Sequence, residues 1–404
     1  MISSERLSLS RKPRLLEVSY KWLPYILGIA FSFSSYTYVG VALTLILSAW
    51  YLALGWKEII KDKWSLVVIG FFLAITCKDA VEFVLKNETF AAFAKSGSRV
   101  FVLAGSAAML LSYSRDKIER AFVIGYGIAA AWIGIVFIFM RFSVVPWIYN
   151  YNEFGDLAMW FPMLLGARLY SKGDKKSRTL AVIIFIASLA ILGFDAVGMK
   201  IQGSRTAPVA LAVGFAFTLI SDKKVSRWLG FALLIGAVGS IIVCALYFSP
   251  RIDTLLEHRQ ELWQAYWVKA FQRPLTGWGW TSAADNIRLL EPVMRGKFYY
   301  PEFIATGLGP HNSFLAIFFE DGILAFVGFI AVLIFKIAKS SHPLRPFDIA
   351  LFAYIVVISL DAMMAGGLTY LGYFLGVCIL SIDRGEKRIT PAAALLQTNE
   401  GHRR

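Results

Sequence analysis

The sequence predicts an all-α polytopic membrane protein with about 12 transmembrane helices. Two observations on its 404 residues predict this class. Hydrophobic residues make up 57% of the chain and charged residues only 17%, whereas soluble domains contain about 45–50% apolar residues. The apolar residues also gather in long blocks. A soluble domain, a disordered chain and a disulfide-stapled scaffold are therefore excluded.

Each apolar block is a candidate span, because a helix that crosses a bilayer needs about 20 mostly apolar residues. The first two blocks are almost contiguous, and so are the last two, so each pair is expected to form a helical hairpin. The expected spans are residues 21–36, 38–56, 64–82, 98–113, 121–140, 156–170, 179–197, 206–220, 228–249, 322–337, 347–365 and 367–382.

The basic residues predict that both termini are cytoplasmic, because Lys and Arg accumulate in short cytoplasmic loops. In that topology 27 of the 41 basic residues lie on the cytoplasmic side. Half of the remainder fall in one long outer segment, where the rule is weak. The net charge of +14 is then mostly a topology signal. A nucleic-acid partner is not needed to explain it.

This topology divides the chain into four parts. Residues 1–249 are expected to form a bundle of nine spans, 250–321 a long loop outside the cytoplasm, 322–382 the last three spans, and 383–404 a cytoplasmic tail. A segment as long as this outer loop is usually functional. The active-site residues are therefore expected there.

The long loop is expected to begin with an amphipathic helix over residues 257–271. Apolar residues recur in it at helical spacing, and Arg259, Trp263 and Tyr266 share one stripe. Arg259 is thus predicted to head the buried face. Residues 281–309 look irregular. A second helix is expected from His311 to Phe319, interrupted at Glu320-Asp321-Gly322 before the next span.

Three side chains in or beside this loop could carry chemistry. Arg205 lies at the outer start of a span, and arginine grips phosphate oxygens in a bidentate fork. Arg259 could do the same, and His311 follows Gly-Pro at a helix N-terminus, where it could accept a proton from a sugar hydroxyl. The alternatives are that the arginines anchor lipid headgroups and that His311 simply caps its helix.

Four further residues are weaker candidates for substrate binding. Trp278 and Trp280 could stack on sugars, or belong to an interfacial aromatic belt. Lys78 could contact substrate, or pair with Glu82 four residues on. Asp361, late in its span, could orient a histidine or pair with an arginine.

Motifs for metals and nucleotides are missing from the sequence. It contains no D-x-D, P-loop, G-x-G-x-x-G, C-x-x-C or H-E-x-x-H, and its four histidines are scattered. Neither a metal nor any other cofactor is expected. No nucleotide or nucleic-acid partner is expected either.

The order of the short motifs resembles the O-antigen ligase/polymerase superfamily, and within it the O-antigen ligases of Gram-negative inner membranes. The resemblance covers roughly residues 200–335. One departure is the pair Glu320-Asp321, where many relatives have a single acidic residue. The motifs are Gly203-Ser204-Arg205, His258-Arg259, Pro274-Leu275-Thr276-Gly277-Trp278-Gly279, His311-Asn312-Ser313-Phe314-Leu315 and Glu320-Asp321-Gly322-Ile323-Leu324.

The resemblance implies a metal-independent glycosyltransferase of the C-type membrane fold, with its active site facing the periplasm. Such enzymes take a glycan from undecaprenyl diphosphate, and the ligases transfer it to lipid A–core. The family's histidine corresponds to His311 and its arginines to Arg205 and Arg259. Asp361 matches a carboxylate of the last outer loop, and Asn312 is a candidate for substrate binding.

The expected mechanism is a direct displacement with inversion, in which the arginines stabilise the leaving diphosphate and His311 activates the acceptor hydroxyl. The expected partners are the lipid-linked donor, the lipid A–core acceptor and membrane lipids. An O-antigen polymerase and a protein O-oligosaccharyltransferase are alternatives. A transporter or flippase is an alternative from another class, although it would place functional charges near the membrane midplane.

Overall fold

The protein is described here from a computed structural model. The structure describes residues 22–30, 32, 38–85, 90–113, 115–139, 151–198, 206–221, 225–255, 258–279, 283–298, 300–339 and 345–360. The predictions for Arg205, Trp280, Asp361, the span 367–382 and the tail 383–404 lie outside the described residues.

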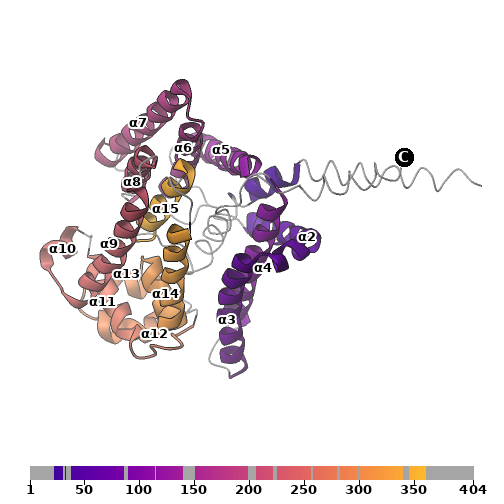
Figure 1. Ribbon diagram of the computed structural model, residues 1–404. Coiled ribbons are helices and arrows are strands. Elements are labelled where there is room, and N and C mark those ends of the chain that lie inside the picture. Colours follow the sequence, from indigo (N-terminus) through magenta and orange to yellow (C-terminus); the bar gives the residue numbers. More distant parts are fainter. Residues whose placement is uncertain are drawn as a thin grey trace, which may run out of the picture.

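All secondary structure within the described ranges is helical, as the sequence predicts (Figure 1). Helices α2–α9 and α15 lie on predicted spans, and α10–α13 lie between α9 and α14. The helices are α2 (Tyr38–Lys61), α3 (Lys63–Val84), α4 (Phe90–Ser112), α5 (Arg115–Phe139), α6 (Tyr151–Ser171), α7 (Lys175–Gly198), α8 (Thr206–Ile220), α9 (Ser226–Leu246), α10 (Pro250–Leu255), α11 (Arg259–Ala270), α12 (Ala283–Met294), α13 (Tyr300–Thr306), α14 (Ser313–Lys339) and α15 (Pro346–Ile358).

Two of the described helices are long and apolar enough to cross a membrane by themselves. They are Arg227–Leu246 in α9 and Ser313–Phe335 in α14. A third span results if Ala42–Ala53 and Gly55–Lys61, which meet at a 67° bend in α2, are taken together. These helices agree with a membrane protein, while the count of 12 spans stays a prediction.

The helices pack in two groups, which contact each other where α3 meets α14. Helices α2 and α3 pack against α4, whereas α15 lies against α8, α6 and α9, and α11 lies against α9 and α14. Figure 1 shows the first group in indigo and violet beside the second. Fully buried aromatic side chains, among them Phe185, Phe318 and Phe319, fill the second group. The buried hydrophobic core extends through both groups.

The expectation of irregular chain over residues 281–309 is wrong, because α12 and α13 form there. Asn286, Leu290 and Met294 are buried and lie four residues apart, so α12 has one inward face. Pro292 lies in the last turn of α12, and the apolar residues of the helix recur at helical spacing, so the sequence did carry a signal for it.

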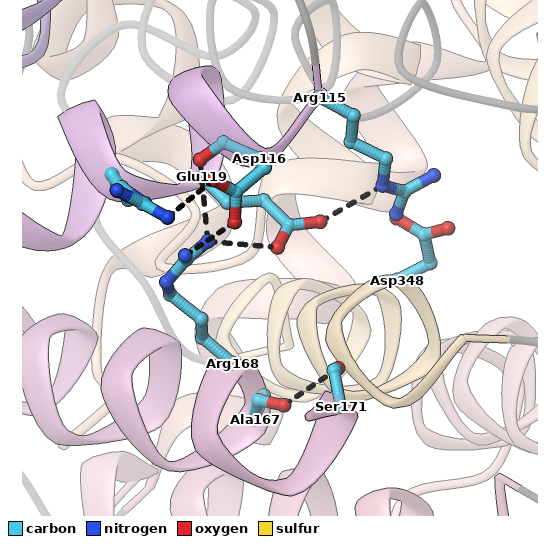
Figure 2. A network of polar contacts seen from close by, with 8 residues as sticks. Arg115, Asp116, Glu119, Ala167, Arg168, Ser171 and Asp348 are labelled. Carbon is cyan, nitrogen blue, oxygen red and sulfur yellow. Dashed lines mark hydrogen bonds and ion pairs between the residues drawn. The ribbon is translucent and has the colours of Figure 1, made fainter. Parts of the chain in front are cut away.

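A network of ionic side chains joins α5, α6 and α15 at one end of the bundle (Figure 2). Arg115 pairs with Glu119 at 2.8 Å and with Asp348 of α15. Arg168 of α6 pairs with Glu119 at 3.3 Å and with Asp116. The three chain segments that meet here were all placed on the cytoplasmic side by the charge count, and a single side is what their contact requires.

Candidate active site

Helix α11 carries Arg259 and is fixed to the end of α9 by a buried glutamine. The Gln260 carboxamide is completely buried and donates to the carbonyls of Cys244, at 2.9 Å, and Tyr247, at 2.6 Å. Those carbonyls belong to the last turn of α9 and to the residue that caps it, where backbone acceptors lack partners within the helix. The predicted helix over 257–271 is thus observed as Arg259–Ala270. Its stripe of Trp263 and Tyr266 is buried, as predicted.

The start of α11 is set by a histidine–aspartate pair. His258 has a left-handed backbone (φ 64°), and its Nδ1 lies 2.8 Å from Oδ2 of the buried Asp253. The imidazole stacks on the ring of Phe298 at 3.8 Å between centroids. The other carboxylate oxygen of Asp253 accepts from the N–H of Glu261 at 3.3 Å. These contacts hold the first turn of α11, and so the backbone of Arg259, in place.

Helix α14 begins at Ser313, and Asn312, directly after His311, is its N-cap. The Asn312 side chain is buried and accepts from the N–H of Leu315 at 3.0 Å, which is a helix N-cap. Its amide nitrogen donates to the carbonyl of Leu360 at 3.1 Å. The structure thus puts His311 at the helix N-terminus where the sequence predicts it. Both polar atoms of Asn312 bind backbone, which favours a structural role over contact with substrate.

His311 and Arg259, far apart in the sequence, interact electrostatically. Burial, followed by the positive charge of Arg259, lowers the pKa of His311 from 6.5 to about 3. The imidazole is therefore neutral at physiological pH. No residue in the described part of the chain forms a hydrogen bond with this ring. A neutral imidazole beside a fixed guanidinium can accept a proton next to a bound anion.

The turn that holds Trp278 is docked on a break in α14. Gly322 has φ 82° and ψ 179°, which interrupts the helix at the position where the sequence predicts an interruption. The N–H groups of Trp278 and Gly279 donate to the carbonyls of Phe319, at 2.8 Å, and Glu320, at 2.9 Å. In return, the N–H of Ile323 donates to the carbonyl of Pro274 at 2.7 Å. Backbone groups freed by the break are thus paired by the turn.

The Trp278 ring is held in place by two contacts of its own. Its indole N–H donates to the carbonyl of Lys269 at 2.7 Å. The guanidinium of Arg273 lies 4.4 Å from its ring centroid, a cation–π distance. Because the Arg273 guanidinium covers one face of the indole, a sugar could stack only on the part of the Trp278 ring that Arg273 leaves uncovered.

Lys78 reaches from α3 to the same turn. Its ammonium donates to the carbonyl of Thr276 at 3.0 Å and pairs with Asp79, at 2.9 Å, and Asp321, at 3.5 Å. Both carboxylates are buried. The structure therefore places Lys78 between α3, the Trp278 turn and the break in α14, where it binds protein groups.

The described residues thus bring together Arg259 and His311, and separately Lys78 and Trp278. Sequence reasoning did not single out Tyr266 or Asn286 as site residues. The hydroxyl of Tyr266 donates to the carbonyl of Leu308 at 2.6 Å, and Asn286 donates to that of Gly307 at 3.2 Å. The shared stripe of Tyr266 with Arg259 was the available signal.

Two comparisons with known proteins bear on this region. Residues 187–330 match the family model described as O-Antigen ligase. Over 201 residues the chain is 24% identical to an O-antigen ligase of Salmonella typhimurium (strain LT2). That alignment covers 46% of this chain and 46% of the relative, so the match spans about half the length of each. No solved structure matches the chain.

Proposed function

We propose that this chain, whose residues 187–330 match the O-antigen ligase family model, acts as an O-antigen ligase that transfers a glycan from undecaprenyl diphosphate to lipid A–core. The observation that carries the proposal is the neutral His311 beside Arg259. Both residues lie within the segment that matches the family model. The pair supplies a proton acceptor and an anion-binding cation in one place.

The donor diphosphate would be held by Arg259 together with Arg205. A guanidinium binds phosphate oxygens through two parallel hydrogen bonds and stays charged at any physiological pH. The N-terminus of α14 lies directly after His311 and adds the positive end of its dipole. Three of its first backbone N–H groups already bind Ser359 or Asn312. The helix would therefore act mainly through its dipole, and the arginines would make the direct contacts.

Transfer would proceed in one displacement. The acceptor hydroxyl gives its proton to His311 while its oxygen attacks the anomeric carbon of the donor sugar. The bond from that carbon to the diphosphate oxygen breaks, and its electron pair leaves with the diphosphate. Arg259 and Arg205 stabilise the charge that develops on this leaving group. Attack opposite to the leaving group inverts the configuration of the sugar.

Donor binding would also make His311 a stronger base. An imidazole of pKa about 3 is a weak proton acceptor. The positive charge of Arg259 is one of the two causes of that low pKa. A bound diphosphate would neutralise this charge and favour the imidazolium, which raises the pKa of His311. The base would then become effective only when the glycan donor is present.

The proposed location is the inner membrane of a Gram-negative bacterium, with both termini in the cytoplasm and the site facing the periplasm. The basic loops around Arg115, Arg168 and Arg345 meet at one end of the bundle through the network of Figure 2. That agrees with one cytoplasmic side. No cofactor is invoked, because a lipid diphosphate is already an activated donor.

The test is the lipopolysaccharide pattern of a deletion strain complemented with wild type or with His311→Ala. A ligase predicts bare lipid A–core in the deletion strain, with long polymer accumulating on undecaprenyl diphosphate. His311→Ala should be present in the membrane but fail to restore the ladder. Core capped by a single repeat unit would indicate a polymerase instead. An unchanged ladder would contradict both and favour transport or protein glycosylation.

A further inference from the structure

The backbone at His311 has an unusual conformation. Among the described residues, two that are not glycine have a positive φ, His258 at 64° and His311 at 47°. A side chain in this left-handed region crowds its own backbone, so such residues persist where neighbouring contacts hold them. At His258 the hold is the contact with Asp253. At His311 it must come from the residues on either side.

The chain after His311 is fixed by α15. The N–H of Ser313 donates to the carbonyl of Ser359 at 2.9 Å, and Asn312 donates to that of Leu360. The C-terminal side of His311 is thereby attached to the end of another helix. These contacts do not restrain the backbone before His311, residues 307–310, so a second contact is needed to fix the direction of the imidazole.

The chain before His311 is fixed by Tyr266. Its hydroxyl donates to the carbonyl of Leu308 over 2.6 Å, and the next carbonyl toward the N-terminus, that of Gly307, accepts from Asn286. The Tyr266 side chain is completely buried, and its ring meets that of Phe319 edge-on at 4.8 Å. Packing therefore leaves the hydroxyl little freedom to bond elsewhere.

Tyr266 is a dependable donor across the working pH range. Burial, followed by the nearby charge of Glu320, raises the pKa of its hydroxyl well above the usual 10. It also stands on the same face of α11 as Arg259, two helical turns further along. One rigid helix therefore places both the cation beside His311 and the group that holds the loop of His311.

We propose that Tyr266 is a positioning residue, which holds the left-handed His311 against Arg259 through its hydrogen bond to the Leu308 carbonyl. This inference rests on the proposed function. Tyr266 touches neither donor nor acceptor in this account. Its hydroxyl acts through the backbone, and its loss lets the 307–310 segment turn the imidazole away from the reacting oxygen.

The test is Tyr266→Phe in the full-length protein, purified and reconstituted with a glycan-linked undecaprenyl diphosphate and lipid A–core. Displacement of a catalytic group by about 1 Å reduces turnover by about 100-fold. We expect kcat to fall about 10- to 100-fold, with KM for the donor unchanged within about twofold because Arg259 stays in place. A looser loop admits water to His311 and so raises the pKa of its imidazole. The acid limb of the pH profile should therefore also move to higher pH.

Tyr300→Phe is the matched control. It removes a hydroxyl from the same outer segment, one that donates to Glu291 at 3.3 Å and does not contact the His311 loop. It should keep wild-type kcat and pH profile. If Tyr266→Phe does not accumulate in the membrane, Asn286→Ala decides, because it removes the donor to Gly307 and should lower kcat in the same way.

Two failures are distinguishable. If the wild type transfers glycan but the Tyr266 variant keeps wild-type kcat and pH profile, the positioning role is refuted while the proposed function stands. An equal loss in Tyr300→Phe would likewise refute it, since loss of any hydroxyl in the segment would then suffice. If the wild type transfers nothing, the proposed function itself fails.

Discussion

Replacement of Gly277 by alanine should separate the docked turn from the break in α14. Gly277 has φ 69°, and a Cβ there would lie 2.3 Å from the carbonyl oxygen of Glu320. That atom is backbone, so the two segments must move apart. Gly296 is the matched control, because its φ is 83° and nothing lies within 4 Å of an added Cβ.

The magnitude follows from the two contributions. The left-handed conformation costs an alanine about 1–2 kcal/mol at either glycine. Overlap with a packed neighbour adds about 1–3 kcal/mol at Gly277 alone. Gly277→Ala should therefore destabilise the protein by about 2–5 kcal/mol. At about 2.1 cal/mol/K per residue, a chain of 404 residues loses about 1 °C in melting temperature for each kcal/mol.

The assay is thermal melting of both variants in the same detergent, together with glycan transfer after reconstitution. Gly277→Ala should melt about 2–6 °C below wild type and lose most activity, because the turn joins α11, which carries Arg259, to α14, which follows His311. Gly296→Ala should melt about 1–2 °C lower and keep its activity. Equal shifts in the two variants, or full activity in Gly277→Ala, would refute the close packing of turn and helix.

Three further predictions concern charge and metal. Donor binding is expected to raise the pKa of His311 from about 3. As the pH is lowered, kcat should therefore fall first, and kcat/KM for the donor, which reports the free enzyme, should fall only at a lower pH. Acid limbs of the two profiles that coincide near pH 6.5 would contradict this. Asp348→Asn breaks a mostly buried ion pair with Arg115 and should lower the free energy of unfolding by about 2–3 kcal/mol. Asp116→Asn changes a side chain that is 58% exposed and should lower it by less than about 1 kcal/mol. Equal losses of the two variants in urea unfolding would contradict a stabilising role of the network. EDTA should leave transfer unchanged, and a loss restored by added Mg²⁺ or Mn²⁺ would disprove the metal-free mechanism.

Local sequence patterns predicted the parts of the site that depend on helical periodicity. The spacing of Arg259, Trp263 and Tyr266 gave α11 and its buried face, and Gly-Pro before His311 gave the start of α14. The break at Gly322 followed from two acidic residues and a glycine within an apolar run. In each case the information lies within a few turns of chain.

Long-range contacts were not predictable in the same way. Helix α12 was missed although its apolar residues recur at helical spacing, but that spacing alone could not show that Asn286 binds the Gly307 carbonyl. The pairing of Lys78 with Asp321 crosses more than two hundred residues. The meeting of His311 with Arg259 was expected from the family resemblance, whereas the hold of Tyr266 on Leu308 depends on packing that only the fold reveals.

The most direct test of the central claim is glycan transfer by the purified, reconstituted protein with undecaprenyl-diphosphate glycan and lipid A–core as its only substrates. We expect transfer by wild type and by Arg288→Ala, whose side chain is 78% exposed. His311→Gln, which cannot take up the proton, and Arg259→Ala, which cannot hold the diphosphate, should lose at least about 100-fold in kcat. Wild-type rates in either of these two variants would contradict the account.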